Sequence, residues 1–139
     1  MDLHTATTWA ADRKNAVLIT LRKDGRAQSS DIAYAVAGER FLISVTADRA
    51  KTANMRRDPR VVLHITEPDS WSYVAFDGTV ELSPVATEPH DVTCDLLVDY
   101  FERVAGEAHP DWKEYRQAMV MERRLVASFV PTSAVGQVR

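Results

Sequence analysis

Short apolar runs separated by closely spaced turn signals constrain this chain more than any other feature of its sequence. The first run, Ala16 to Leu21, is rich in β-branched residues and is followed by Asp24-Gly25, a pair typical of tight hairpins. Strands joined by hairpins pair antiparallel, because a parallel pair needs a longer crossover. We therefore predict an antiparallel sheet with strands at 16–21, 27–36, 41–46, 60–66, 71–83 and 125–130, and we expect 133–139 to pair as well.

Helical periodicity appears in segments that alternate with these strands. The spacing predicts a short helix at 4–11, one at about 47–58, one at about 90–104 and one at 111–120. Asp77-Gly78 interrupts the fifth strand and predicts a bulge or bend there. Six short strands of this kind can close into a small barrel, so the expected class is α+β.

Length and composition limit the classes of protein to consider. The 139 residues fit one domain spanning 1–139. The 17 Lys and Arg residues are outnumbered by 20 Asp and Glu residues, which disfavours general nucleic-acid binding because such domains are usually basic. Cys94 is the only cysteine, so an internal disulfide or a multi-cysteine zinc site is excluded. No run approaches the roughly 20 apolar residues that span a bilayer. We expect a cytoplasmic protein with no membrane span.

The segment 44–60 carries a local excess of positive charge at a predicted strand-to-helix junction. Only Asp48 and Asp58 oppose its five basic residues, which are Arg49, Lys51, Arg56, Arg57 and Arg60. A helix N-terminus has free N–H groups and partial positive charge, so flanking Arg and Lys side chains favour a phosphate site. A solvated helix face explains the same pattern, and the residues alone leave both interpretations open.

Two strand segments carry side chains that suit a planar or polyol ligand. Gln28 and Ser30 alternate within one strand and share a face, which is either the solvated face of a sheet or a polar floor for a ligand. Trp71 and Tyr73 share a face in the same way. Aromatic pairs on a strand usually belong to a core or a dimer surface, and stacking on a planar cofactor is the alternative.

Residues able to perform catalysis by themselves are sparse. The glycines are far apart, so no dinucleotide fingerprint or P-loop is present. The four histidines, at positions 4, 64, 90 and 109, have no metal-ligand spacing, so we predict packing or surface roles for them and no metal site. His64 alternates within a predicted strand and can face a cavity. No arrangement of acid, base and nucleophile stands out. If the protein is an enzyme, its chemistry therefore belongs to a bound cofactor.

Several short motifs, in this order, give the chain a family resemblance over nearly its whole length. They are Lys23-Asp-Gly-Arg26, Arg49-Ala-Lys-Thr52, Asn54-Met-Arg-Arg-Asp-Pro-Arg60, Trp71-Ser-Tyr73, Gly78-Thr79, and Asp111-Trp112 with Tyr115-Arg-Gln-Ala-Met119. With them the sequence resembles the split-barrel flavin- and deazaflavin-binding proteins related to pyridoxamine 5′-phosphate oxidase. It is most similar to the actinobacterial branch that binds coenzyme F420.

The resemblance implies an α+β fold, namely a six-stranded antiparallel split β-barrel of the FMN-binding type with flanking helices. It also implies a homodimer with cofactor sites at the subunit interface. The implied cofactor-binding residues are Arg49, Lys51, Thr52 and Ser44 around the phosphate, Gln28, Ser30 and Asp31 near the ring or its ribityl chain, Trp71 and Tyr73 near the interface pocket, and Arg56 toward the cofactor tail. Asp31 stands where close relatives are expected to have asparagine.

The leading hypothesis is an F420-dependent oxidoreductase that transfers a hydride between the deazaflavin C5 and an electron-poor small organic acceptor. Tyr73 or a water molecule would protonate the product. F420 carries a phosphodiester and a glutamate tail, so the surplus of arginines, Arg57 and Arg60 included, favours it over FMN. The alternatives are an FMN-binding oxidoreductase of the same superfamily, a deazaflavin carrier without a substrate, and a dimeric interaction module. The segment from Arg123 to Pro131 does not match the expected vitamin-phosphate element, which argues against pyridoxamine 5′-phosphate oxidation.

Overall fold

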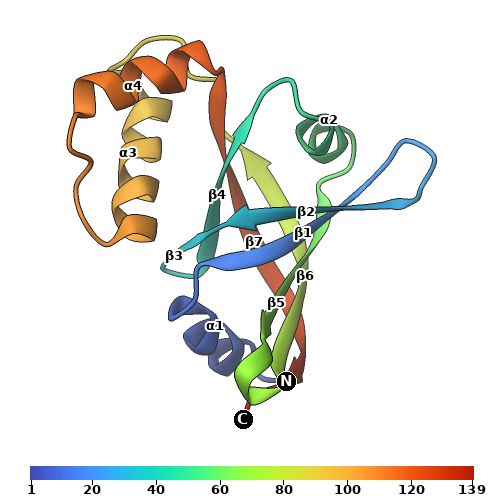
Figure 1. The fold of residues 1–139 in the computed structure, drawn as a ribbon. Helices are drawn as coiled ribbons and strands as arrows, with labels where there is room; N and C mark the ends of the chain where they lie inside the picture. The colour runs from blue at the N-terminus through green and yellow to red at the C-terminus, as the bar shows by residue number, and fades with distance from the viewer.

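Seven strands form one curled antiparallel sheet in the computed structural model, which describes residues 1–139 (Figure 1). The sheet order is β2-β1-β5-β6-β7-β4-β3. The strands are β1 (Asn15–Leu21), β2 (Ala27–Ala33), β3 (Ala35–Ala37), β4 (Arg40–Thr46), β5 (Arg60–Glu67), β6 (Ser72–Leu82) and β7 (Arg124–Gln137). The α+β split barrel expected from the sequence is therefore confirmed. The tail also pairs as expected, because β7 runs on to Gln137 beside β6.

The two edge strands of the sheet, β2 and β3, are separated in the chain only by Tyr34. The chain therefore passes from one edge of the sheet to the other within one residue, which requires the sheet to curl until its edges meet. The sequence predicted one strand at 27–36, and the structure divides it, so the sheet has seven strands where six were expected. Tyr34 is buried and packs on Phe41, whose ring also contacts Phe76 and Phe129 inside the barrel.

Four α-helices flank the sheet (Figure 1). They are α1 (Leu3–Ala11), α2 (Ala50–Arg57), α3 (Val92–Ala105) and α4 (Trp112–Met121), with a short 3-10 turn, η1 (Pro68–Ser70). α3 and α4 form a hairpin between β6 and β7, and they enclose a second small core with Leu42 and Val126 of the sheet. α1 covers the opposite end of the barrel, where the two termini also lie. None of the four helices is long and apolar enough to cross a membrane.

The predicted irregularity in the fifth strand is a β-bulge between Asp77 and Gly78 of β6. A Cβ at Gly78 would lie 2.2 Å from the carbonyl oxygen of Val130 and 2.7 Å from the ring of Phe129. Only a residue without a side chain lets β7 approach this closely. The bulge therefore lies at a close approach of β6 and β7 that only glycine permits.

Candidate functional site

α2 begins directly after the turn that follows β4, and this turn positions the basic residues. Arg49 is the N-cap of α2, and its carbonyl accepts from the N–H groups of Thr52 and Ala53. Thr52 is fully buried, and its hydroxyl donates to the carbonyl of Thr46 over 2.6 Å. Thr52 therefore holds the turn from inside, while Arg49 stays exposed and Lys51 stays half-buried beside it.

A cavity of about 370 Å³, here called the cation-lined cavity, opens beside this turn. Its polar wall consists of Asp31, Ser44, Lys51 and Arg124. Its apolar wall comes from β2 and from the helical hairpin, and consists of Ile32, Ala33, Tyr100, Phe101, Tyr115 and Met119. The hydroxyl of Tyr100 on α3 donates a hydrogen bond to the carbonyl of Ala33 over 2.9 Å, so α3 is bonded directly to the end of β2 at the cavity.

Positive charge in the cation-lined cavity is only partly compensated. Burial lowers the pKa of Lys51, and the neighbouring guanidinium groups of Arg49 and Arg124 lower it further. Arg124 forms an ion pair with Glu122 at 3.0 Å and donates to Ser44 Oγ over 3.3 Å. Neither Arg49 nor Lys51 forms an ion pair in the structure. Because a desolvated ammonium group among like charges is stabilised by an anion, the donor set suits a phosphate.

Arg124 is the charged residue of this cavity that sequence reasoning did not assign to the site, and the apolar wall was not assigned either. The sequence groups it with the basic end of the preceding helix, a pattern that favourable interaction with the helix C-terminus explains. In the structure it opens β7, where it pairs in register with Thr46 at the end of β4. A prediction of which strands pair is the signal that would have found it.

The polar residues of β2 lie on both faces of that strand. Gln28 and Ser30 share the inward face, as the alternation predicted, opposite Thr20 and Leu18 of β1. Gln28 Oε1 accepts from Asn54 Nδ2 over 3.1 Å, so this amide is tied to α2. Neither Gln28 nor Ser30 lines the cation-lined cavity, whereas Asp31 does.

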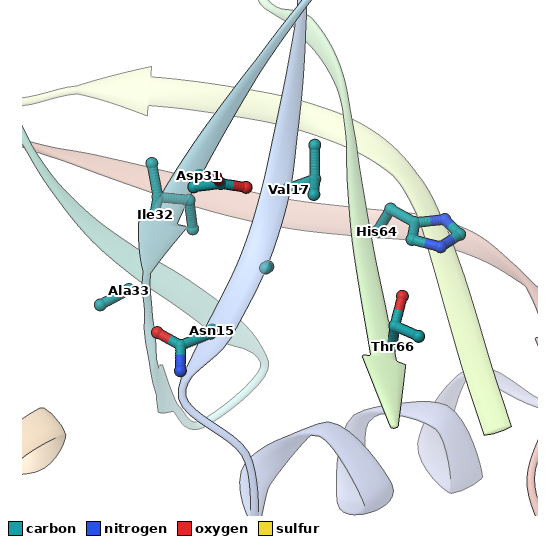
Figure 2. A pocket seen from close by; sticks show the side chains of 8 residues that line it. Asn15, Val17, Asp31, Ile32, Ala33, His64 and Thr66 are labelled. Atoms are coloured by element: carbon teal, nitrogen blue, oxygen red, sulfur yellow. The ribbon is translucent and has the colours of Figure 1, made fainter. Parts of the chain in front are cut away.

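A second cavity of about 530 Å³, here called the sheet-face cavity, lies on the outer face of β2, β1 and β5. It shares Asp31, Ile32 and Ala33 with the cation-lined cavity, so the two adjoin along β2. Figure 2 shows Asp31, Val17 and His64 on neighbouring strands at the same level, and the pairing register agrees. The two cavities therefore form adjoining parts of one candidate site, a cationic end and a sheet-face end.

The two aromatic residues expected at the interface pocket differ in position. β6 begins at Ser72, so Trp71 lies outside the strand in a left-handed conformation with φ 55°, and its side chain is 77% exposed. The expectation that Trp71 and Tyr73 share a strand face was therefore wrong, because the chain turns sharply after η1. Tyr73 stacks on His64 with ring centroids 5.7 Å apart, which brings it to the rim of the sheet-face cavity. Trp71 lines neither cavity of a single chain.

The three arginines expected near a cofactor tail are not equally available. Arg57 donates to the carbonyl of Leu21 and to Asn54 Oδ1. Arg60 forms an ion pair with Asp58 at 2.7 Å, and hydrogen bonds from Arg60 lower the pKa of that carboxyl to about 2. Arg56 is exposed and forms no ion pair or side-chain hydrogen bond. Of the three, Arg56 alone keeps its full donor capacity for a ligand.

Solved structures with the same fold carry names that refer to different cofactors. An F420 reductase is 24% identical, covers 88% of this chain and 89% of its own, and superposes with a TM-score of 0.67. An FAD-binding protein from Mesorhizobium loti is 18% identical over 98% and 92% of the two chains, with a TM-score of 0.69. A heme-binding protein from Mycobacterium smegmatis is 20% identical over 97% of this chain and 53% of its own, with a TM-score of 0.71.

These likenesses show the fold and do not choose among the cofactors. The sequence comparison is more specific, because the family model described as pyridoxamine 5′-phosphate oxidase matches residues 4–129. That match includes both walls of the cation-lined cavity and every strand of the sheet-face cavity. This chain therefore belongs to the pyridoxamine 5′-phosphate oxidase family.

Proposed function

We propose that this protein is an F420-dependent oxidoreductase that transfers a hydride between the deazaflavin C5 and an electron-poor small organic acceptor. The observation that carries the proposal is the positive charge of Arg49 and Lys51, which form no ion pair, beside Arg124 at one end of a site whose other end is an outer sheet face. A cofactor with an anionic chain and a planar ring matches both ends.

The residues present divide the binding work between them. Lys51 would hold the phosphodiester together with Arg49, the N-cap of α2 beside the cavity, and with Arg124, which neighbours Lys51 and donates to Ser44 Oγ. The ring would lie along the outer face of β2 and β1, over Val17. Bound there, the reduced deazaflavin supplies the hydride. The protein contributes orientation and charge, because a cofactor reaction needs its reactive atom held against the acceptor.

The second candidate cofactor is FMN, and the state of the arginines favours keeping it. Arg57 and Arg60 are bound to groups of this chain, so only Arg56 is left for the glutamate tail that distinguishes F420 from FMN. We expect F420 to bind with micromolar or tighter affinity, and we expect its affinity to be higher than that of FMN. If the protein instead prefers FMN, we would assign FMN as the cofactor, and Arg49 and Lys51 would keep their proposed role as the phosphate clamp.

Isothermal titration with oxidised F420 and, in parallel, FMN tests this assignment. Arg49→Ala and Lys51→Ala should each weaken F420 binding by roughly tenfold to a hundredfold, as expected for a lost charge-assisted hydrogen bond to phosphate. Arg22→Ala is the matched control, because Arg22 is exposed in the β1–β2 turn and lines neither cavity. Affinities within twofold of wild type in both clamp variants would contradict the proposed clamp. Tight F420 binding without turnover of enones or quinones would indicate a deazaflavin carrier.

We also propose a homodimer, with the cofactor sites at the subunit interface. Four apolar side chains are exposed where β6 begins and β7 ends, a concentration typical of a surface covered by a partner. They are Trp71, Tyr73, Val135 and Val138. This surface adjoins the sheet-face cavity through Tyr73, so a second copy seated on it would enclose the ring end of the site.

The molar mass in solution tests the dimer. Light scattering should give twice the mass of the chain for the wild-type protein and a lower mass for Val135→Asp at micromolar concentration. Met121→Asp is the matched control, because Met121 is 86% exposed but lies on α4, away from this surface. A monomeric wild-type protein, or equal dissociation of both variants, would contradict the proposal.

A further inference from the structure

We propose that Lys51 is a self-acylation site: its amine takes the acyl group of an acyl phosphate whose phosphate is held by the guanidinium groups of Arg49 and Arg124. An acylated Lys51 has no charge with which to hold a cofactor phosphate, so the modification prevents cofactor binding. The site itself goes beyond the proposed function, whereas its effect on F420 rests on that function. The position of Lys51, its charged neighbours and the cavity that it lines support the inference.

Lys51 differs in position from the other lysines of the chain. Lys14, Lys23 and Lys113 are exposed. Lys51 is half-buried in the first turn of α2, and its side chain lines the cation-lined cavity. It forms no ion pair with a carboxylate. Lys51 is therefore the lysine that combines partial burial with an amine that a small molecule in this cavity can reach.

The surroundings of Lys51 favour the uncharged amine, which is the form that attacks an acyl group. Burial lowers the pKa of Lys51, and the positive charges of Arg49 and Arg124 lower it further. Asp31 also lines the cavity, but it is exposed and forms no ion pair with the lysine. At neutral pH a larger fraction of Lys51 is therefore uncharged than of a fully solvated lysine.

The two guanidinium groups beside Lys51 supply recognition of the phosphate. Arg49 is exposed and forms no ion pair. Arg124 is paired with Glu122 at 3.0 Å, and its hydrogen bond to Ser44 Oγ is long at 3.3 Å. In an acyl phosphate, a single oxygen atom joins the anionic phosphate to the electrophilic carbonyl carbon. A phosphate held by these arginines therefore places that carbon beside the amine of Lys51.

The reaction is an acyl transfer that needs no further reagent. The lone pair of Lys51 Nζ attacks the carbonyl carbon, so that a C–N bond forms and the C–O bond to the phosphate breaks. The electron pair of the broken bond leaves with the phosphate, which also receives the proton lost by the amine. The products are an amide and hydrogen phosphate, and no atom is oxidised or reduced. The guanidinium groups stabilise the negative charge on the departing phosphate.

Acylation changes the cation-lined cavity in two ways. It removes the positive charge of Lys51, and it adds an acyl group to a space that the side chains of Tyr100 and Met119 also border. Both changes oppose binding of an anionic chain. Isothermal titration should therefore show that F420 binds the acetylated protein at least as weakly as it binds Lys51→Ala.

Rates of acetylation at the four lysines test the site without any cofactor. The protein is incubated with acetyl phosphate and, in parallel, with the N-hydroxysuccinimide ester of acetic acid, which has no phosphate. Mass spectrometry of peptides gives a rate for each lysine. With acetyl phosphate, Lys51 should react about tenfold faster than Lys14, Lys23 or Lys113, or faster still. The ester should show a much smaller preference, and inorganic phosphate should slow the reaction of acetyl phosphate at Lys51 alone.

Arg124→Gln separates recognition of the phosphate from the reactivity of the amine. The informative quantity is the ratio of the acetyl phosphate rate to the ester rate at Lys51, because a changed pKa of the amine affects both rates. This ratio should fall by about tenfold in Arg124→Gln, which lacks one charge-assisted contact to phosphate. Arg116→Gln is the matched control, since Arg116 lies on α4 and does not line the cavity, and its ratio should equal that of wild type.

The results distinguish failure of the site from failure of the proposed function. Equal acetylation of the four lysines by acetyl phosphate, or equal ratios in the two arginine variants, would overturn the self-acylation site and leave the proposed function standing. If the unmodified protein does not bind F420, the proposed function fails together with its control by acylation. The four rates, measured without cofactor, still decide the site in that case.

Discussion

The Tyr34 hydroxyl donates a hydrogen bond to the carbonyl oxygen of Ala10 over 2.6 Å, in the buried interior. Tyr34 is the residue at which β2 becomes β3, and Ala10 belongs to the last turn of α1. The bond therefore joins the helix that covers one end of the barrel to the point where the sheet closes on itself. Burial around this hydroxyl also raises the pKa of Tyr34.

Tyr34→Phe should lower the free energy of unfolding by about 0.5–1.5 kcal/mol, because it removes a buried hydrogen bond and leaves the Ala10 carbonyl only the N–H of Arg13. Urea unfolding followed by circular dichroism measures the change. Tyr73→Phe is the matched control, since Tyr73 is 39% exposed, and it should stay within about 0.5 kcal/mol of wild type. Equal effects of the two substitutions would contradict a stabilising role for the Tyr34 bond.

Gly78→Ala should destabilise the protein by about 1–3 kcal/mol, the usual cost of overpacking, because the new methyl group would overlap backbone of β7. The matched control is Gly25→Ala, which changes a glycine with φ 88° and nothing within 4 Å of the new Cβ. Only the backbone conformation opposes that change, at about 1–2 kcal/mol. Thermal unfolding of both variants should show the larger loss at Gly78, and the reverse order would contradict the close approach of β6 and β7.

Arg124→Gln should raise the pKa of Lys51, because it removes one of the two positive neighbours that lower it. A pH titration of the Lys51 side chain by NMR measures this shift without any ligand. The same variant should bind F420 about tenfold more weakly if the phosphate contacts this guanidinium. Arg116→Gln on α4 is the control, because it removes one positive charge outside the cavity and should leave the pKa of Lys51 unchanged. An unchanged pKa of Lys51 in Arg124→Gln would mean that the two side chains do not share a cavity.

Lowering the pH should reduce the free energy of unfolding as Asp91, the N-cap of α3, becomes protonated. Burial raises the pKa of Asp91, but the N–H groups of Thr87, Cys94 and Glu88 outweigh it and lower the pKa to about 2. A carboxyl whose pKa is lower in the folded state stabilises the fold above its unfolded pKa of about 4, and this contribution disappears as the pH falls from about 4 to about 2.

Asp91→Asn keeps an oxygen acceptor but cannot titrate, so its stability should depend less on pH in this window than that of wild type. Urea unfolding at pH 7, 4 and 3 makes the comparison. Asp91→Ala also removes the cap and should lower stability at pH 7 by about 1 kcal/mol. Asp12→Asn, at an exposed position after α1, serves as control. Parallel pH profiles for wild type and Asp91→Asn would contradict this assignment.

Local sequence signals predicted the elements of this fold well, because each depends on residues close together in the chain. Asp24-Gly25 gave the first hairpin, and the apolar spacing of 90–104 gave a helix observed at Val92–Ala105. The glycine at position 78 predicted a bulge where one is found. The short motifs indicated the family, which the match over residues 4–129 confirms.

Other features could not be obtained from local patterns. The division of the strand at Tyr34 follows from barrel closure, which forces the chain to change edges there. Thr52 belongs to a motif that implies a phosphate contact, yet the turn after β4 directs its hydroxyl to Thr46. Trp71 reads as part of a strand, and only the geometry after η1 takes it out of the sheet.

The sequence by itself determined the fold class, the family and the basic start of α2, since periodicity, turn chemistry and charge are properties of short segments. The tertiary structure decided which residues meet: Arg124 joins Lys51 and Ser44, and His64 lies two strands from Asp31 on one face. The physical reason is register. Ser44 and Arg124 are separated by 80 positions in the chain, and they approach because β7 pairs with β4, an arrangement set by packing of the whole sheet.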